Sequence, residues 1–198
     1  MPADLLEATS LSLAAIAARK CYGRDAASRI DGELTFEDMN LLRKIILETD
    51  PPHDSILEHI KYTWDVYGIS RACSHQLVRH RIASYSQKSQ RYVNERSPEY
   101  ITPASVSAEP KARDIYHDLM VRAQKAYIDL QNAGIRKEDA RFVLPNAWTT
   151  SVIVTLNARS LRNFLMLRLD RRAQWEIRRL ARDMFNQIPD SHKFLYQK

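Results

Sequence analysis

The fold class is decided by the stretch Ile60-Lys61-Tyr62-Thr63-Trp64-Asp65-Val66. Its side chains alternate between apolar and polar, which is the period-two pattern of a strand with one buried face. A second stretch, Thr149-Thr150-Ser151-Val152-Ile153-Val154-Thr155-Leu156, is rich in β-branched residues and predicts another strand. The helices predicted around these strands follow no regular βαβ rhythm. We therefore expect an α+β fold, with an antiparallel-type sheet flanked by long helices, in a single-domain subunit over residues 1–198.

Helices are predicted from apolar periodicity and from their end signals. Thr35-Phe36-Glu37-Asp38 resembles a capping box and opens a helix that Asp50-Pro51-Pro52 stops. Gly134 closes the longest helix, and Ser55 is a candidate cap for a short turn before the first strand. The predicted helices cover residues 5–21, 35–47, 70–78, 111–132, 137–143, 158–169 and 172–187, and residues 94–110 form the longest irregular stretch.

Composition and charge narrow the function classes. The chain has 198 residues with 44% hydrophobic and 27% charged residues, which is typical of a soluble globular protein. Its formal net charge is +6 and its pI about 9.4. A solvated basic surface is the simplest interpretation, and nucleic-acid binding or capture of polyanionic small molecules are two sharper ones. Arginines outnumber lysines, which favours defined bidentate contacts over a diffuse basic stripe.

Targeting signals and metal ligands are not recognisable in the sequence. No apolar run approaches the roughly 18 to 20 residues of a membrane span, and Met1-Pro2-Ala3-Asp4-Leu5 does not read as a secretory signal. Cys21 and Cys73 have no metal-ligand spacing, so we expect a reduced, cytoplasmic setting in which both are small core residues. The His, Asp and Glu residues show no ligand spacing either, so no metal is expected.

Glycine is scarce, with 4 glycines in the whole chain. The dinucleotide fingerprint GxGxxG and the phosphate loop GxxxxGK[ST] both need glycines, because the backbone must approach phosphate closely. Neither pattern occurs. If this protein binds a nucleotide, side chains must therefore do most of the holding.

One polar stretch is suited to that task, namely Arg79-His80-Arg81-Ile82-Ala83-Ser84-Tyr85-Ser86-Gln87-Lys88-Ser89-Gln90-Arg91-Tyr92. Such polar density rarely serves a core, because buried polar groups need partners. Guanidinium groups match phosphate, and serine hydroxyls and glutamine amides add short-range donors and acceptors. The stretch predicts a cradle for a phosphate and a heterocycle.

A second group opens the helix predicted at 158–169. Asn157, Arg159 and Asn163 lie near its N-terminal end, where free N–H groups and the helix dipole favour an anion. Arg159 and Asn163 are four residues apart and so share a face. An amphipathic helix with solvated arginines would explain the apolar spacing, but not the Asn-Ala-Arg-Ser start.

With these residues in place, the chain resembles a known family, the flavin-dependent thymidylate synthases. The resemblance covers nearly the whole length and rests on separated motifs in the same order: His53-Asp54-Ser55-Ile56-Leu57-Glu58-His59, Gln76-Leu77-Val78-Arg79-His80-Arg81 with Ser89 eight residues beyond, Ala140-Arg141-Phe142-Val143-Leu144-Pro145, Asn157-Ala158-Arg159-Ser160-Leu161 with Asn163, Phe164 and Arg168, and Ala173-Gln174-Trp175-Glu176-Ile177. It implies a methyltransferase and flavoprotein of dTMP biosynthesis. Such an enzyme converts dUMP to dTMP with methylenetetrahydrofolate as carbon donor, FAD as hydride carrier and NADPH as reductant.

The resemblance also implies a site, residue by residue. The residues implied for FAD are His53, Ser55, Arg79, His80, Arg81, Gln87, Asn157, Ala158, Arg159 and Asn163. Those implied for dUMP are Gln76, Leu77, Val78, Arg79, Gln87, Lys88, Ser89, Gln90, Arg91 and Arg141, together with Arg168 as the residue that activates the uracil ring. Ser86 and Gln87 stand where the family often has Asn and Glu. Arg79 and Arg81 alternate in the sequence, so either one is a candidate for the flavin diphosphate and the other for the nucleotide phosphate.

The chemistry of the reaction agrees with the assignment of Arg168. Methylation at C5 of uracil requires electron density at C5, and a fixed guanidinium beside N3 and O2 stabilises the developing uracil anion. Arg168 is placed for this because it ends the helix that the flavin group begins. Neither Cys21 nor Cys73 lies in a recognisable nucleophile setting, so we expect no covalent cysteine adduct.

Assembly and two rival functions complete the expectations. The resemblance implies a homotetramer with sites between subunits, and the helices predicted at 111–132 and 172–187 offer apolar faces for contact. One rival is a flavin enzyme that modifies uracil nucleotides differently, for example by hydroxymethylation. The other is a nucleic-acid-binding module that uses Arg79, Arg81 and Arg91 on phosphates, with Tyr85 and Tyr92 for stacking. We expect no nucleic-acid and no membrane partner.

Overall fold

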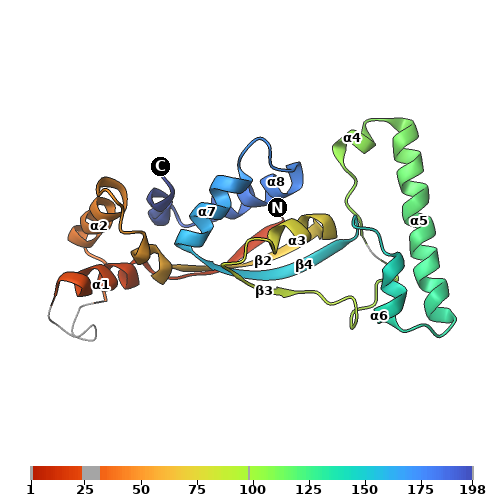
Figure 1. Ribbon diagram of the computed structural model, residues 1–198, viewed down its shortest axis with the longest axis horizontal. Coiled ribbons are helices and arrows are strands. Elements are labelled where there is room, and N and C mark those ends of the chain that lie inside the picture. The colour runs from red at the N-terminus through yellow and green to blue at the C-terminus, as the bar shows by residue number, and fades with distance from the viewer. Residues whose placement is uncertain (1, 24–31, 98, 198) are drawn as a thin grey trace.

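An antiparallel sheet of four strands runs through the middle of the molecule (Figure 1). The computed structural model describes residues 2–23, 32–97 and 99–197. The strand order is β1-β2-β4-β3, and the strands are β1 (Ala3–Ala8), β2 (Lys61–Ser70), β3 (Ser84–Gln87) and β4 (Thr149–Asn157). The two predicted strands are therefore confirmed, and they are neighbours at the centre of the sheet.

One face of the sheet carries the core. In β2 the alternate side chains of Tyr62, Trp64 and Val66 are fully buried, which is the pattern that predicted the strand. Three helices lie over this face, α3 (Arg71–Leu77), α7 (Ala158–Arg168) and α8 (Trp175–Asn186) (Figure 1). Leu77, Leu161 and Leu180 from these helices are fully buried in the same cluster.

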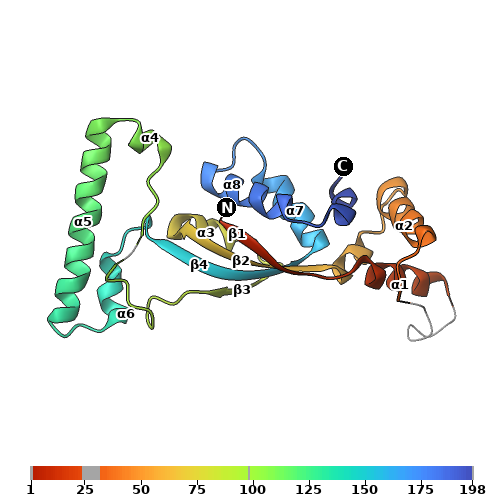
Figure 2. The ribbon, with the colours of Figure 1, turned by 180° about the vertical axis from the view of Figure 1, so that it is seen from behind.

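The two ends of the sheet carry different helical groups (Figure 2). At one end lie α1 (Leu11–Tyr22) and α2 (Phe36–Arg43), which continues as a π-helical turn over Lys44–Glu48. At the other end stand α4 (Ala104–Ser107), α5 (Pro110–Asn132) and α6 (Lys137–Ala140), followed by the 3₁₀-helix η4 (Arg141–Val143). A small separate core of Met120, Ala123 and Trp148 holds α5 to the sheet end.

Two further short 3₁₀-helices lie within the described residues. They are η3 (Asp54–His59), before β2, and η5 (Asp190–Tyr196), near the C-terminus. Both pack against the core through buried apolar side chains, Ile56 and Leu57 in η3 and Phe194 and Leu195 in η5. η3 also contacts α7, so the segment before β2 lies beside the start of α7.

Several local predictions are confirmed in detail. Thr35 and Asp38 form both bonds of the capping box at the start of α2. Gly134 has a φ of +87°, the left-handed conformation expected just after a helix that ends at Ala133. The helices predicted at 70–78, 111–132, 158–169 and 172–187 are observed with ends shifted by three residues or fewer.

The N-terminal prediction is partly wrong. Residues 3–8 form an edge strand, and the helix begins only at Leu11, where the Ser10 hydroxyl accepts a bond from the Ser12 N–H. The strand is stabilised by remote partners, because it pairs with β2 and the side chain of Gln187 bonds to its backbone at Ala3 and Leu5. Ser55 is not a cap: η3 starts after His53 and has no side-chain cap. The strand β3 was also missed.

Candidate functional site

A pocket of about 810 Å³ lies where β4 passes into α7. It collects six of the residues implied for FAD, although they come from two distant segments of the chain. These residues are Arg79, His80, Arg81, Asn157, Arg159 and Asn163, and Glu58, Ile82, Ser160 and Leu167 complete the lining. Ala158 stands at the start of α7 but is fully buried. We call this cavity the α7 pocket.

His80 is fixed in the α7 pocket by two side chains of α7, those of Ser160 and Phe164. Its Nε2 lies 2.6 Å from the Ser160 hydroxyl, which itself donates to the Ile82 carbonyl oxygen at 2.5 Å. The only proton of that hydroxyl is thereby used, so His80 must donate through Nε2, and its Nδ1 is the unprotonated nitrogen. Burial, helped by the positive charge of Arg168, lowers the pKa of His80 and keeps the imidazole neutral near pH 7.

The N-terminus of α7 is built by its cap. The side-chain oxygen of Asn157 accepts the Ser160 N–H at 2.8 Å, and the Ala158 N–H donates to the Ile60 carbonyl oxygen at 2.8 Å. The first turn of the helix is thus anchored to the segment just before β2. A helix start held in this way keeps its positive dipole end directed at the pocket.

Arg159 connects the α7 pocket with a neighbouring one. The second pocket, about 690 Å³, is lined by Arg159 and by a loop that includes His53 and Ser55. Within the α7 pocket, Arg159 forms an ion pair with Glu58 at 2.6 Å. Eight of the ten residues implied for FAD therefore line two pockets that share one arginine.

Gln87, the remaining implied flavin residue besides Ala158, lies elsewhere. It ends β3, and its side-chain nitrogen donates to the hydroxyls of Ser74 at 3.0 Å and Thr150 at 3.2 Å. These contacts hold Gln87 between α3 and β4 and outside the lining of the α7 pocket. The structure brings Gln87 close to α3, on which Gln76 lies.

Three cations implied for dUMP lie further along the sheet, and each has an internal partner. Lys88 forms an ion pair with the buried carboxylate of Glu95 at 3.0 Å. Arg91 contacts the Glu138 carboxylate at 3.0 Å, and the Arg141 Nε donates to the Glu138 carbonyl oxygen at 3.0 Å. The structure groups Arg91 with Arg141 around Glu138, away from the α7 pocket.

The other nucleotide residues differ in their exposure. Gln76 and Val78 belong to the end of α3, where Val78 is exposed. Leu77 is fully buried in the core. Ser89 accepts the Arg91 N–H through its hydroxyl at 3.2 Å, and Gln90 is buried.

Arg168 lies between the two groups. Its Nη2 donates to the Gln76 carbonyl oxygen at 3.2 Å, which fixes the guanidinium against α3. Burial raises the pKa of Tyr85 to about 12, with the Arg168 charge acting in the opposite direction. Tyr85 therefore keeps its proton, which it shares between the carbonyl oxygens of Leu77 and His80, and it is not free to stack on a base as the nucleic-acid interpretation requires.

The cysteines show no nucleophile setting. Burial raises the pKa of the Cys73 thiol well above its usual range, so this thiol stays protonated. Cys21 is exposed on α1, which contradicts the expectation that both cysteines are core residues. The reason is its helix face: Leu11, Ala14, Ala15 and Ala18 of α1 are buried instead.

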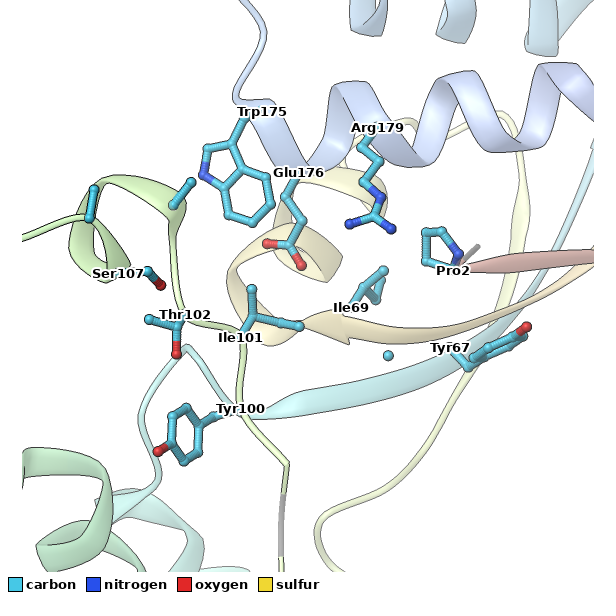
Figure 3. A pocket seen from close by; sticks show the side chains of 13 residues that line it. Pro2, Tyr67, Ile69, Tyr100, Ile101, Thr102, Ser107, Trp175, Glu176 and Arg179 are labelled. Carbon is cyan, nitrogen blue, oxygen red and sulfur yellow. The ribbon is translucent and has the colours of Figure 1, made fainter. Parts of the chain in front are cut away.

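A third pocket of about 860 Å³ lies between α8, the end of β2 and the segment 100–108 (Figure 3). Trp175, Glu176 and Arg179 project into it from α8, opposite Ile69 and Ile101. The Glu176 carboxylate also accepts from the Ser70 N–H at 2.7 Å and from the Ser70 hydroxyl at 2.6 Å. Because Ser70 caps α3, this buried carboxylate fixes the helix that leads to residues 79–81.

Sequence reasoning missed the side chains that hold the implied ligand residues. Ser160 could have been found from its position three residues after the cap Asn157, and Glu58 and Glu176 lie inside motifs of the resemblance. Glu95 and Glu138 have no local signal, because their ion pairs depend on the tertiary fold. These five residues do not belong to the implied ligand set, yet four of them fix its members.

Metal-ligand clusters and membrane-spanning helices are both absent from the described residues. Among residues 2–23, 32–97 and 99–197, no three His, Cys, Asp or Glu side chains gather as metal ligands would. Within the same part of the chain, no helix combines the length and the apolar character needed to cross a membrane.

Comparisons with known proteins agree with this arrangement. The model of the family described as "Thymidylate synthase complementing protein" (Thy1) matches residues 4–192. A flavin-dependent thymidylate synthase of Geobacter sulfurreducens is 47% identical over 176 residues, covering 88% of this chain and 75% of the relative. One from Clostridium tetani is 38% identical over 190 residues, covering 88% and 76%.

A solved structure is similar over the whole chain. It is thymidylate synthase X of Helicobacter pylori with FAD and dUMP, with a TM-score of 0.77 and 28% sequence identity, covering 100% of this chain and 98% of that one. The fold, the motif order and the sequence identity agree. The chain therefore belongs to the family of flavin-dependent thymidylate synthases.

Proposed function

We propose that this protein is an FAD-dependent thymidylate synthase that methylates dUMP to dTMP. The carbon comes from methylenetetrahydrofolate and the reducing equivalents come from NADPH. The names of the related enzymes and the FAD and dUMP bound in the Helicobacter pylori structure support this reaction. The family match over residues 4–192 supports a single catalytic domain.

The observation that carries the proposal is the α7 pocket, because its chemistry fits FAD. Arg79, Arg81 and Arg159 bring three cations to one cavity of about 810 Å³, which suits an anionic diphosphate. The pocket also contains the apolar side chains of Ile82 and Leu167, both of them exposed, which suits a planar ring system. When bound, FAD supplies the hydride-transfer chemistry.

The chain's own residues bind and orient in this proposal. Arg79, Arg81 and Arg159 hold phosphate, while the amides of Asn157 and Asn163 and the neutral His80 supply directional hydrogen bonds. His53 and Ser55 border the cofactor from the second pocket. Gln87 is a positioning contact between flavin and nucleotide, because it lies against Ser74 and Thr150.

The nucleotide half of the site is proposed from the second group. Lys88, Ser89, Gln90, Arg91 and Arg141 hold dUMP, and Gln76, Leu77 and Val78 border it from the end of α3. Arg168 stabilises the uracil anion that forms as C5 becomes nucleophilic. Its bond to the Gln76 carbonyl oxygen keeps the guanidinium oriented before the substrate binds.

We also propose a cytoplasmic homotetramer with sites formed between subunits. Two observations support the assembly: the nucleotide residues other than Arg79 do not line the α7 pocket, and α5 exposes the apolar side chains of Ile115, Leu119 and Val121. Two free cysteines, Cys21 and Cys73, support a reducing compartment.

The test is an anaerobic assay of the purified protein with dUMP, methylenetetrahydrofolate and NADPH, with dTMP measured as product. We expect flavin absorbance in the purified protein and dTMP that depends on all three compounds. A product with the mass of a hydroxymethylated nucleotide would select the rival flavin reaction. A colourless protein that takes up no FAD would contradict the proposal.

A further inference from the structure

Two ion pairs join η3 to α7 side by side. Glu58 pairs with Arg159 at 2.6 Å, and Asp54 pairs with Arg162 at 2.7 Å. The two acids are four residues apart in η3, and the two arginines are three residues apart in α7. The pairs therefore connect the same two elements at neighbouring levels.

The two pairs differ in exposure. The side chains of Arg159 and Glu58 are 53% and 49% exposed, and both residues line the α7 pocket. The side chains of Arg162 and Asp54 are only 19% and 28% exposed. An exposed pair contributes little and exchanges partners easily, whereas a more buried, hydrogen-bonded pair persists.

Arg162 also has a third partner. Its Nε and Nη2 donate to the Leu195 carbonyl oxygen at 3.0 and 2.6 Å. This carbonyl belongs to η5, which is anchored by the buried side chains of Phe194 and Leu195 and by Arg43 stacked over the Phe194 ring at 4.7 Å. The guanidinium of Arg162 is thus held by the core, and Asp54 is held by Arg162.

Asp54 lies between His53 and Ser55, so its position sets theirs. The backbone of this loop is also tied to the preceding turn, through the His53 N–H to the Ile45 carbonyl oxygen at 3.0 Å. An anion that binds Arg159 in the α7 pocket must compete with Glu58. Once Glu58 is displaced, the pair of Asp54 and Arg162 is the remaining ionic link between the loop and α7 among the described residues.

We propose that Arg162 is a positioning residue of the flavin site. It keeps the loop of His53 and Ser55 against α7 while Arg159 exchanges Glu58 for an anionic group of the cofactor. The C-terminal turn η5 contributes to this positioning, because the Leu195 carbonyl oxygen orients the guanidinium of Arg162. The inference rests on the proposed function, since it assigns FAD to the α7 pocket.

The test is a double-mutant cycle on FAD affinity. Asp54→Asn, Arg162→Gln and the double variant are compared with wild type by titrating the apoprotein with FAD. Asp54→Asn keeps the side-chain shape and the Leu195 bonds, so it carries the test even if Arg162→Gln folds poorly. The matched control is Asp118→Asn, which removes an exposed ion pair with Arg122 on the remote helix α5.

We expect Asp54→Asn to raise the Kd for FAD about tenfold, as the loss of a partly buried charge-assisted bond does. The double variant should bind no more weakly than Arg162→Gln, because both changes remove the same link. The Kd for dUMP at saturating FAD should change less than about twofold, which a general loss of structure would not spare. Asp118→Asn should bind FAD as wild type does.

Equal FAD affinity of Asp54→Asn and wild type would overturn the inference, and so would strictly additive effects of the two changes. A loss of affinity for both ligands in parallel would also overturn it, because it would mark a structural role alone. Wild-type protein that takes up no FAD would instead overturn the proposed function, so the two failures are distinguishable.

Discussion

The proposed flavin end and the proposed nucleotide end of the sheet pair their cations with internal partners to different extents. At the flavin end, defined by the α7 pocket, residues 79–81 and 157–163 meet around one cavity. At the nucleotide end, defined by residues 88–91 and Arg141, the cations contact carboxylates and a carbonyl of the same chain. At the proposed flavin end, Arg159 is the one arginine of the pocket with an ion pair among the described residues, to Glu58. At the proposed nucleotide end, Lys88, Arg91 and Arg141 all contact internal partners.

This difference follows from the elements that carry each group. The flavin residues lie directly after α3 and at the capped start of α7, and both helices are anchored in the core. Residues 88–91 follow β3 as a loop, and Arg91 pairs with Glu138 of α6, a short helix that packs against α5. A helix start that is anchored in the core can hold charged side chains in position before a ligand binds. Cations on a loop are instead stabilised by internal carboxylates until a ligand or a second subunit binds.

The largest expected effect concerns Arg168, which lies between the two ends. Arg168→Lys should lower kcat about 100-fold or more, because an ammonium cannot both bond to Gln76 and spread charge along N3 and O2 of uracil. FAD content should remain that of wild type, because Arg168 does not line the α7 pocket. Steady-state kinetics and flavin absorbance measure the two quantities.

Arg172→Lys is the matched control for that change. Arg172 is an exposed arginine that pairs with Asp170 in the loop after α7, so its replacement should leave turnover unchanged. An Arg168→Lys enzyme with a kcat within threefold of wild type would remove this residue from the mechanism. Another residue would then have to link the flavin end to the nucleotide end.

A smaller effect would show whether the two ends of one site come from different subunits. Arg159→Ala damages the flavin end and Arg141→Ala damages the nucleotide end, so each variant alone should be nearly inactive. If every site takes one end from each of two copies, equal co-expression should restore about one quarter of the activity by random pairing. Activity per tetramer after co-purification measures this.

The control for this mixing experiment is a pair of variants damaged at the same end. Arg81→Ala co-expressed with Arg159→Ala should recover nothing, since both residues line the α7 pocket. Recovery in this control, or no recovery in the first mixture, would contradict a site shared in the proposed way.

The sequence predicts the centre of the fold well and its edges poorly. β2 and β4 are buried on one face, so their alternation and β-branched residues are visible in the sequence. Residues 5–8 of β1 fall within the range predicted as a helix, residues 5–21, and their strand state depends on pairing with β2. β3 is polar, and it is a strand through its register with β4, from Ser84 opposite Thr155 to Gln87 opposite Val152.

The site shows the same division. The arginine clusters can be recognised in the sequence because their residue types fit phosphate, and the resemblance to the family implies their roles. Their grouping cannot be predicted from the sequence, because Arg81 and Arg159 come together only when the end of α3 and the start of α7 lie on one face of the sheet. The internal partners Glu95 and Glu138 follow from tertiary contacts as well.

The smallest expected effect is a pH dependence specific to the flavin end. His192 in η5 is buried, and its Nδ1 lies 2.9 Å from the Tyr62 hydroxyl. Burial lowers the pKa of His192 below its usual 6.5. The unfolded chain therefore binds the proton at a higher pH than the folded protein, and stability is complete above about pH 6.5 and falls as the pH drops below it.

His192→Asn removes this titration while keeping a polar side chain that can accept a bond from Tyr62. Between pH 7.5 and pH 5.5, wild type should lose more free energy of unfolding than the variant, by about 1.4 kcal/mol at most. Urea unfolding at the two pH values measures both losses. His80 titrates with the same sign in both proteins, so the difference reports His192 alone. Equal losses of unfolding free energy in wild type and variant would mean that η5 tolerates a protonated His192. The flavin end would then be less rigid than the contacts of η5 with Arg162 imply.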